Sequence, residues 1–195
     1  LNRDFIKCDS RNAQTFNQIF GAWQPDVFID NHTSNGADYQ YTMTLIPTQH
    51  NKLAAPLAEV LQKSLLPSLY KSMEKDGWEM TPYVYAQDTP DGGIAGFLDH
   101  PRYSSGYASL FNTLSFMPET HMLKPFKDRV VSTYAFMESM LEFIEQKHQQ
   151  IISNQEKANV LTKQQVLFPL QWSLDQSKAD DLLFKGYEAA YKPSK

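Results

Sequence analysis

The sequence predicts an α/β fold with a mixed, largely parallel sheet flanked by helices. Short apolar runs that are typical of buried strands, such as 26–31 and 113–118, are separated by longer segments whose apolar residues have helical spacing. The chain has 195 residues, of which 42% are hydrophobic and 13% aromatic, so it can bury a substantial core. These observations favour one domain, with room for a small appendage.

The first elements follow in order along the chain. Residues 10–23 carry apolar side chains at helical spacing, Ser10 is a suitable N-cap, and Pro25 lies just beyond the expected end of the helix. Residues 26–31 predict a buried strand. The alternation of apolar and polar residues over 39–46 predicts a second strand.

The middle of the chain combines a long helix with a long loop. Residues 53–75 predict a helix, with Pro56 in its first turn and Pro67 expected to kink or split it. A short strand is expected over 83–85. The stretch 87–106 is rich in Gly, Pro, Asp and Ser, which predicts a long surface loop, and loops of this length are often functional.

The last third of the chain begins with an apolar strand over 113–118 that ends at Glu119. A second long helix is expected over 125–153, with one apolar face. That face is formed by Val130, Tyr134, Met137, Leu141 and Ile144. The polar segment 154–165 predicts a linker. Two strand-like stretches in 166–195 predict a β-rich appendage or the start of a further domain.

Composition and charge exclude several classes of protein. The formal net charge of −4 and a pI of about 5.7 give no basic field, which argues against nucleic acid as the main partner. No apolar run approaches the length that spans a membrane. Cys8 is the single cysteine, so no disulfide forms within the chain.

His32 is the first candidate site residue, because an apolar strand delivers it into the polar segment 30–36 (DNHTSNG). Ligand sites of α/β enzymes form beyond the carboxyl ends of sheet strands, and a neutral imidazole is a good zinc ligand. The alternative is a hydrogen-bonded histidine at a turn. Taken alone, a histidine in this setting fits the alternative better.

Glu119 is the second candidate, as a general base. A carboxylate at the end of an apolar strand is partly desolvated, which raises its pKa towards the working range of a base. It could then accept a proton from a metal-bound water. The alternative is a carboxylate that caps or pairs locally, two residues before His121.

Two further groups could bind a substrate. Asn2 and Arg3 could hold a terminal carboxylate, because a guanidinium makes paired hydrogen bonds to such a group. Tyr103 and Tyr107 could donate hydrogen bonds from the end of the long loop. The alternatives are a surface arginine beside Asp4 and packing aromatics in a chain with ten tyrosines.

Taken together, these residues resemble the M14 family of zinc carboxypeptidases, in its bacterial branch with short connections. The segment 2–5 (NRDF) resembles the Asn-Arg motif of the family, and 30–36 resembles the strand that carries the third zinc ligand. The segment 106–121, which includes Glu119, resembles the stretch that ends in the catalytic glutamate. The resemblance covers about residues 1–150, with three motifs in the right order.

The resemblance implies a function and a role for each candidate. In the intact protein, zinc-bound water would hydrolyse a C-terminal peptide (amide) bond, with His32 as a zinc ligand and Glu119 as the base. The substrate would be a peptide or an N-acyl amino acid, held by Asn2 and Arg3 and covered by Tyr107 or Tyr103. Family habit favours export to the periplasm or secretion.

The departures from the family pattern imply that part of the catalytic domain lies upstream. The other two zinc ligands of the family come from a His-x-x-Glu motif, and no histidine of this chain has a glutamate three residues on. Residues 1–153 would then be the C-terminal part of the catalytic domain, missing its N-terminal strands, with two zinc ligands upstream of Leu1. We expect this chain by itself to be inactive.

Two alternatives remain open. Relatives of this fold deacylate N-acyl amino acids or cleave peptidoglycan cross-peptides, so the substrate could be an amide other than a C-terminal peptide bond. The second alternative is a binding module that kept the fold and lost the metal site.

Overall fold

The computed structural model describes residues 2–34, 38–86, 94–188, 190 and 192. Parts of three predictions lie outside the described residues, namely Asn35 and Gly36 of the polar segment, 87–93 of the loop, and 189, 191 and 193–195 of the appendage. The helical segments are α1 (Arg11–Trp23), η1 (His50–Lys52), α2 (Ala55–Val60), η2 (Leu61–Leu65), α3 (Leu66–Lys75), α4 (Ser104–Ser109) and α5 (Phe126–Gln164). The strands are β1 (Val27–Ile29), β2 (His32–Ser34), β3 (Met43–Pro47), β4 (Met80–Pro82), β5 (Val84–Ala86), β6 (Ile94–Gly96) and β7 (Leu114–His121).

The main sheet confirms the predicted α/β class with a mixed, largely parallel sheet. Its order is β1-β7-β3-β4, and β2 also pairs with β7 beyond the end of β1. Both β1 and β2 run parallel to β7, β3 runs antiparallel to β7, and β4 runs parallel to β3. The central strand β7 therefore has partners on both sides, and all eight of its residues are buried.

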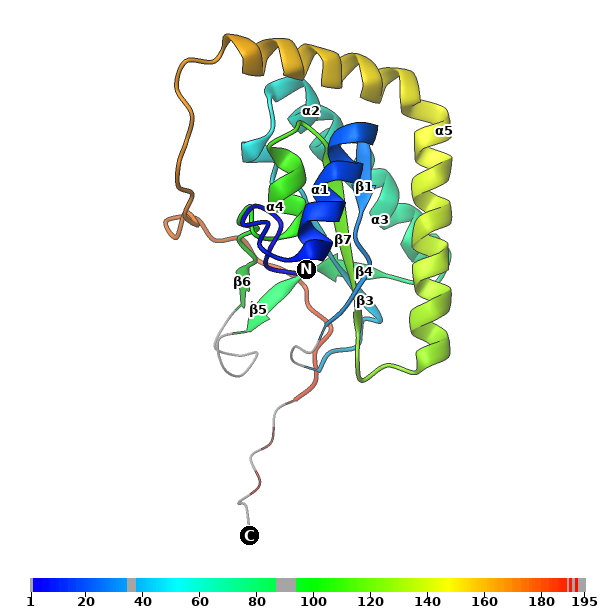
Figure 1. The fold of residues 1–195 in the computed structure, drawn as a ribbon. Helices are drawn as coiled ribbons and strands as arrows, with labels where there is room; N and C mark the ends of the chain where they lie inside the picture. The colour runs from blue at the N-terminus through cyan, green and yellow to red at the C-terminus, as the bar shows by residue number, and fades with distance from the viewer. Residues whose placement is uncertain (1, 35–37, 87–93, 189, 191, 193–195) are drawn as a thin grey trace.

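Helices cover both faces of this sheet (Figure 1). On one face, Leu114 and Phe116 of β7 pack in the main core, to which α2, α3 and α5 contribute. On the other face, α1 and α4 bring Phe20 and Tyr107 into a smaller aromatic cluster. Alternation of side chains along β7 therefore sends its even-numbered residues to the main core and its odd-numbered residues to the α4 side.

The segment around the first two strands departs from its prediction in one respect. The predicted helix and its N-cap are confirmed, because the Ser10 hydroxyl accepts from the backbone N–H of Ala13 at 3.2 Å. The predicted strand 26–31 is also present as β1. The predicted turn after Asp30 is wrong as far as Ser34, because β2 continues the pairing with β7.

The long helical segment 53–75 divides as its prolines predict. A π-helical turn, η2, separates α2 from α3, and Pro67 lies in the first turn of α3. Proline lacks the N–H that a continuous α-helix would use, and a π-turn absorbs the change in hydrogen bonding.

The predicted loop 87–106 contains regular structure in its described part. Its residues 94–96 form β6, which pairs with β5 in a separate two-stranded sheet, and α4 begins at Ser104. Gly106 lies where α4 crosses the backbone of Asp99 and His100, and a Cβ there would collide with both carbonyl oxygens. Only glycine allows this close approach.

The last helix is longer than predicted and presents a different face to the core. The segment 154–165, predicted as a linker, continues α5 through Gln164, because polar residues such as Gln, Glu and Lys are good helix formers. The buried residues of α5 are Ser132, Phe136, Ser139, Met140, Phe143, Ile151 and Ala158. The predicted face is wrong for Val130, Tyr134 and Leu141, which are exposed, because the side of α5 that meets α2 and α3 is buried instead.

The described residues of 166–195 contain no strand, so the predicted β-rich character is wrong there. The segment is extended and returns to the main sheet near its end (Figure 1). The ring of Phe184 contacts Tyr39 and Tyr41, and the backbone N–H of Gln40 donates to the carbonyl of Lys185 at 2.9 Å. Apart from this short contact, the described part of the segment has no backbone pairing with a strand, so it forms none itself.

Candidate active site

The structure brings His32 and Glu119 together. The parallel register of β2 and β7 pairs His32 with Glu119, so both side chains project from the same face of the sheet. His32 Nδ1 lies 4.0 Å from Glu119 Oε1, and both side chains are largely buried. Two residues 87 positions apart in the sequence therefore form one polar pair, just beyond the carboxyl end of β1 and near that of the parallel strand β7, where ligand sites in α/β proteins form.

Asp30 orients the imidazole of His32. Asp30 Oδ2 lies 2.8 Å from His32 Nε2. An ionised carboxylate can only accept, so Nε2 carries the hydrogen, and when the imidazole is neutral its Nδ1 lone pair faces Glu119. Sequence reasoning assigned no role to Asp30. Its position two residues before His32, on the same face of an extended segment, is the signal that could have revealed it.

Asp30, His32 and Glu119 shift one another's pKa values. Burial is the largest effect on the pKa of Asp30 and raises it, but the hydrogen bonds from His32 and Ser104, together with the charge of His32, leave that pKa lowered. The hydrogen bond to Asp30 raises the pKa of His32 against the effect of burial, and the charge of Glu119 adds to it. Burial raises the pKa of Glu119 to about 7, which His32 opposes and Asp30 reinforces. A carboxylate with a pKa near neutrality can both accept and donate a proton there.

Two phenols lie on the Glu119 side of the sheet. Tyr103 is buried against Met117, which precedes Glu119 by two residues on β7, and its ring centroid lies 5.0 Å from that of Phe97. Tyr83 packs against the same cluster. Burial raises the pKa of Tyr83, and the charge of Glu119 contributes, so this phenol stays protonated as a donor. Sequence reasoning selected Tyr103 but not Tyr83.

Tyr107 lies in the aromatic cluster between α1 and α4. Its ring centroid is 5.5 Å from that of Phe20 and 5.9 Å from that of Phe5, and the residue is buried. Among the described residues, no hydrogen bond, ion pair or ring contact joins Tyr107 to His32 or Glu119. Its contact with a substrate stays a prediction, and in this arrangement its ring packs the core.

Asn2 and Arg3 lie in an exposed turn at the start of the chain. The backbone N–H of Phe5 donates to the carbonyl of Arg102 at 3.3 Å, which places this turn beside the residue that precedes Tyr103. No hydrogen bond or ion pair of the Asn2 and Arg3 side chains occurs within the described part of the chain. Both therefore present their polar groups to solvent, and their role as a carboxylate clamp stays a prediction.

The donor chemistry of the site fits one zinc ligand. Zinc-bound histidines commonly donate their second ring N–H to a carboxylate, and Asp30 has that relation to His32. In that relation, the Nδ1 atom would be the one available to a metal. No group of three His, Cys, Asp or Glu side chains able to hold a metal ion occurs within 2–34, 38–86, 94–188, 190 and 192.

The chain was compared with protein-family models, with curated proteins and with solved structures, and none of them matches. In the part of the chain that the structure describes, no helix has the length and hydropathy needed to cross a bilayer.

Proposed function

We propose that this chain is the C-terminal part of the catalytic domain of a zinc-dependent hydrolase that cleaves a C-terminal peptide (amide) bond. The observation that carries the proposal is the pairing of His32 with Glu119 on adjacent parallel strands, with Asp30 bonded to the far side of the imidazole. The three motifs that resemble the zinc carboxypeptidases contain two of these residues, His32 and Glu119, in the roles of ligand and base.

Each residue has a distinct task in this proposal. Asp30 holds the imidazole of His32 in the tautomer that leaves Nδ1 available as a ligand. Zinc, when bound, lowers the pKa of a water and polarises the substrate carbonyl. Glu119 takes the proton of the attacking water on Oε1 and later gives it to the leaving amine, which its pKa of about 7 permits in both directions.

The open edge of the sheet supports the proposal that further strands belong to the intact domain. Among the described strands, β1 and β2 pair only with β7, and the apolar residues of β1 are only half buried. Next to this edge, a hollow of about 310 Å³ separates β2 from the start of α5. Val130, Tyr134 and Leu141 expose an apolar stripe on α5. Strands from a segment upstream of Leu1 would cover this edge and could bring two more zinc ligands to His32.

The test is Glu119→Gln in the intact protein. We expect this variant to keep its zinc and lose about 10²–10⁴-fold in kcat, because the general base is gone while the ligand His32 remains. The matched control is Glu156→Gln on the exposed side of α5, which should retain full activity. Unchanged turnover in the Glu119 variant would overturn the proposal.

Substrate comparison then decides the reaction within this class. Release of C-terminal residues from peptides supports a carboxypeptidase, whereas hydrolysis of small N-acyl amino acids or of peptidoglycan cross-peptides supports the alternative amidases. An intact protein that binds no zinc and cleaves none of these substrates would be the binding module of the other alternative.

The chain of 195 residues makes a separate test possible. One histidine does not hold zinc tightly, since catalytic sites use about three protein ligands. We expect this chain to show no hydrolysis and no stoichiometric zinc at His32. Elemental analysis that finds one zinc per chain, lost in His32→Ala, would contradict this expectation.

A further inference from the structure

A second polar hollow lies at the opposite end of β7 from the proposed active site. It has a volume of about 440 Å³ and lies between α1, the turn that leads from α4 into β7, and the C-terminal part of α5. Thr113 at its floor precedes Glu119 by six residues, which corresponds to about 20 Å along an extended strand. The volume lies within the range of roughly 300–1,000 Å³ that is common for small-ligand sites.

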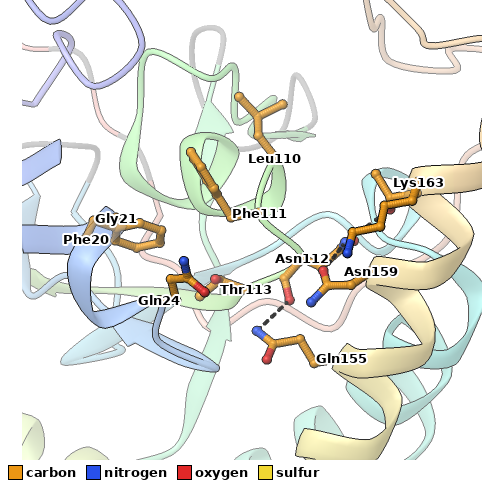
Figure 2. Close-up of a pocket in the computed structure, with 11 residues that line it drawn as sticks. Phe20, Gly21, Gln24, Leu110, Phe111, Asn112, Thr113, Gln155, Asn159 and Lys163 are labelled. Atoms are coloured by element: carbon orange, nitrogen blue, oxygen red, sulfur yellow. Dashed lines mark hydrogen bonds between the residues drawn. The ribbon is translucent and has the colours of Figure 1, made fainter. Parts of the chain in front are cut away.

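One wall of this hollow is aromatic. Phe20 from α1 and Phe111 from the turn face it, with ring centroids 5.4 Å apart (Figure 2). Phe20 is buried, whereas Phe111 is about half exposed and can offer its ring to a ligand. An aromatic face binds the C–H surface of a ligand without demanding a charge.

The opposite wall consists of side-chain amides. The amide of Asn112 donates to Asn159 Oδ1 at 2.9 Å and to Thr162 Oγ1 at 3.1 Å. Gln155 Nε2 donates to the carbonyl of Asn112 at 3.3 Å, and Figure 2 shows these amides on the α5 side of the hollow. The main chain of Asn112 has a φ of 52°, a left-handed conformation that asparagine tolerates better than most residues.

This network leaves hydrogen-bonding capacity in the hollow. Within the described residues, no hydrogen bond of the protein uses Nδ2 of Asn159 or Oε1 of Gln155. Lys163 is the cation in the lining, and no carboxylate lines the hollow. Amides offer both donors and acceptors, which matches a ligand whose groups also do both.

We propose that this hollow binds a neutral, hydroxyl-rich ligand, namely a saccharide unit. Sugar hydroxyls donate and accept, as the amides of Gln155 and Asn159 require, and the apolar face of a pyranose ring can lie against Phe111. The site is separate from the catalytic pair, so its occupation depends neither on zinc nor on Glu119.

The probe is the neutral trisaccharide of N-acetylglucosamine, added to the 195-residue chain at constant pH. We expect saturable shifts of the side-chain amide resonances of Gln155 and Asn159 in two-dimensional ¹H–¹⁵N NMR spectra. Asn159→Ala and Phe111→Ala should each weaken binding about fivefold or more, the equivalent of one lost contact. Cyclohexanol, which has one hydroxyl, should give no saturable shift at the same concentrations.

The controls separate binding from stability. Asn154→Ala makes the same change on α5 outside the lining, and Phe126→Ala removes an exposed ring elsewhere on the same helix, so both should bind as the wild type does. Far-UV circular dichroism checks that each variant is folded. The proposal is overturned if the wild type shows no saturable shift, if cyclohexanol binds equally well, or if the folded Asn159 and Phe111 variants keep full affinity.

Discussion

His32 on β2 and Glu119 on β7 occupy the same register position of two parallel strands, with 4.0 Å between Nδ1 and Oε1. Burial removes water from the Glu119 carboxylate and the charge of Asp30 repels it, so its pKa rises to about 7 although His32 opposes the shift. A carboxylate held in this way destabilises the fold when it is charged. This cost in stability agrees with the catalytic role that we propose for Glu119.

The cost of the Glu119 charge predicts a pH-dependent gain in stability for Glu119→Gln. Between its ordinary pKa of 4.5 and about 7, the folded state binds more protons at this group than the unfolded state, so stability falls as pH rises through this window. The variant should therefore exceed the wild type by up to about 3 kcal/mol at pH 8. The difference should vanish near pH 4, as measured by urea denaturation.

The matched control for that measurement is Glu156→Gln, whose side chain is exposed on α5. Its free energy of unfolding should stay within about 0.5 kcal/mol of the wild type at both pH values. Equal free energies of unfolding for the wild type and Glu119→Gln at pH 8 would show that burial does not raise the pKa of Glu119 to about 7.

The hydrogen bond between Asp30 and His32 makes a second prediction. Because this bond is the main reason that the pKa of His32 is raised, Asp30→Asn should lower that pKa. Titration of the imidazole resonances by NMR measures it directly. Asp128→Asn, in the first turn of α5, is the control and should leave the His32 titration unchanged. If the His32 midpoint also stayed constant in Asp30→Asn, Asp30 would not set the tautomer of the imidazole.

Much of the fold can be read from the sequence because it depends on local patterns. Ser10 caps α1 as its side chain predicts, and Pro67 marks the division of the long helical segment. The strands β1 and β7 come from apolar runs whose length fits buried strands. Each of these features is decided within about ten residues of chain.

The failures come from contacts between distant segments. Tyr134 and Leu141 belong to an apolar stripe on α5 that is exposed in the structure. The sequence of α5 does not show which of its sides is buried, because that depends on where α2 and α3 pack against it. Likewise, β2 exists because β7 offers a partner beyond Phe116, which the polar sequence after Asp30 does not indicate. The docking of Phe184 depends on two tyrosines more than 140 residues away.

The sequence located His32 and Glu119 at strand ends but not their register, since register is fixed by the pairing of β2 with β7 across the sheet. Asp30 is the opposite case. Its spacing of two residues from His32 places both side chains on one face of an extended segment, which predicts their contact. The interpretation of 30–36 as a turn did not allow for this shared face.

The buried ion pair of Lys52 and Asp99 makes a prediction about stability. Lys52 Nζ lies 2.5 Å from Asp99 Oδ1, and both side chains are almost fully buried. Removing one partner leaves a buried charge, so Asp99→Leu should cost about 3–5 kcal/mol in free energy of unfolding. The double variant Lys52→Met with Asp99→Leu should recover most of this loss. Burial raises the pKa of Asp99 even though Lys52 opposes that shift, so the ion pair only partly offsets the cost of burying the charge.

Urea denaturation of the four proteins in this double-mutant cycle gives the coupling energy. The exposed pair of Lys63 and Glu59, at 2.9 Å on the surface, is the comparison, and Lys63→Met should cost less than about 1 kcal/mol. A double variant no more stable than Asp99→Leu alone would mean that the ion pair contributes specific stability beyond the penalty of an isolated charge.

The docked end of the chain makes the last prediction. The ring of Phe184 lies 5.6 Å from that of Tyr39 and 5.4 Å from that of Tyr41, and the backbone N–H of Lys185 donates to the Tyr41 hydroxyl at 3.2 Å. The ring of Tyr39 in turn makes an edge-to-face contact with that of His121, the last residue of β7, with 4.6 Å between the ring centroids. Phe184→Ala should therefore release this segment: the Lys185 N–H should exchange faster, and trypsin should cleave sooner after Lys185, while the free energy of unfolding changes little.

Leu183→Ala is the matched control, because Leu183 is 96% exposed and its loss should alter neither rate. Equal exchange at Lys185 in both variants would show that the backbone hydrogen bonds, rather than the aromatic contact, hold the segment on the sheet.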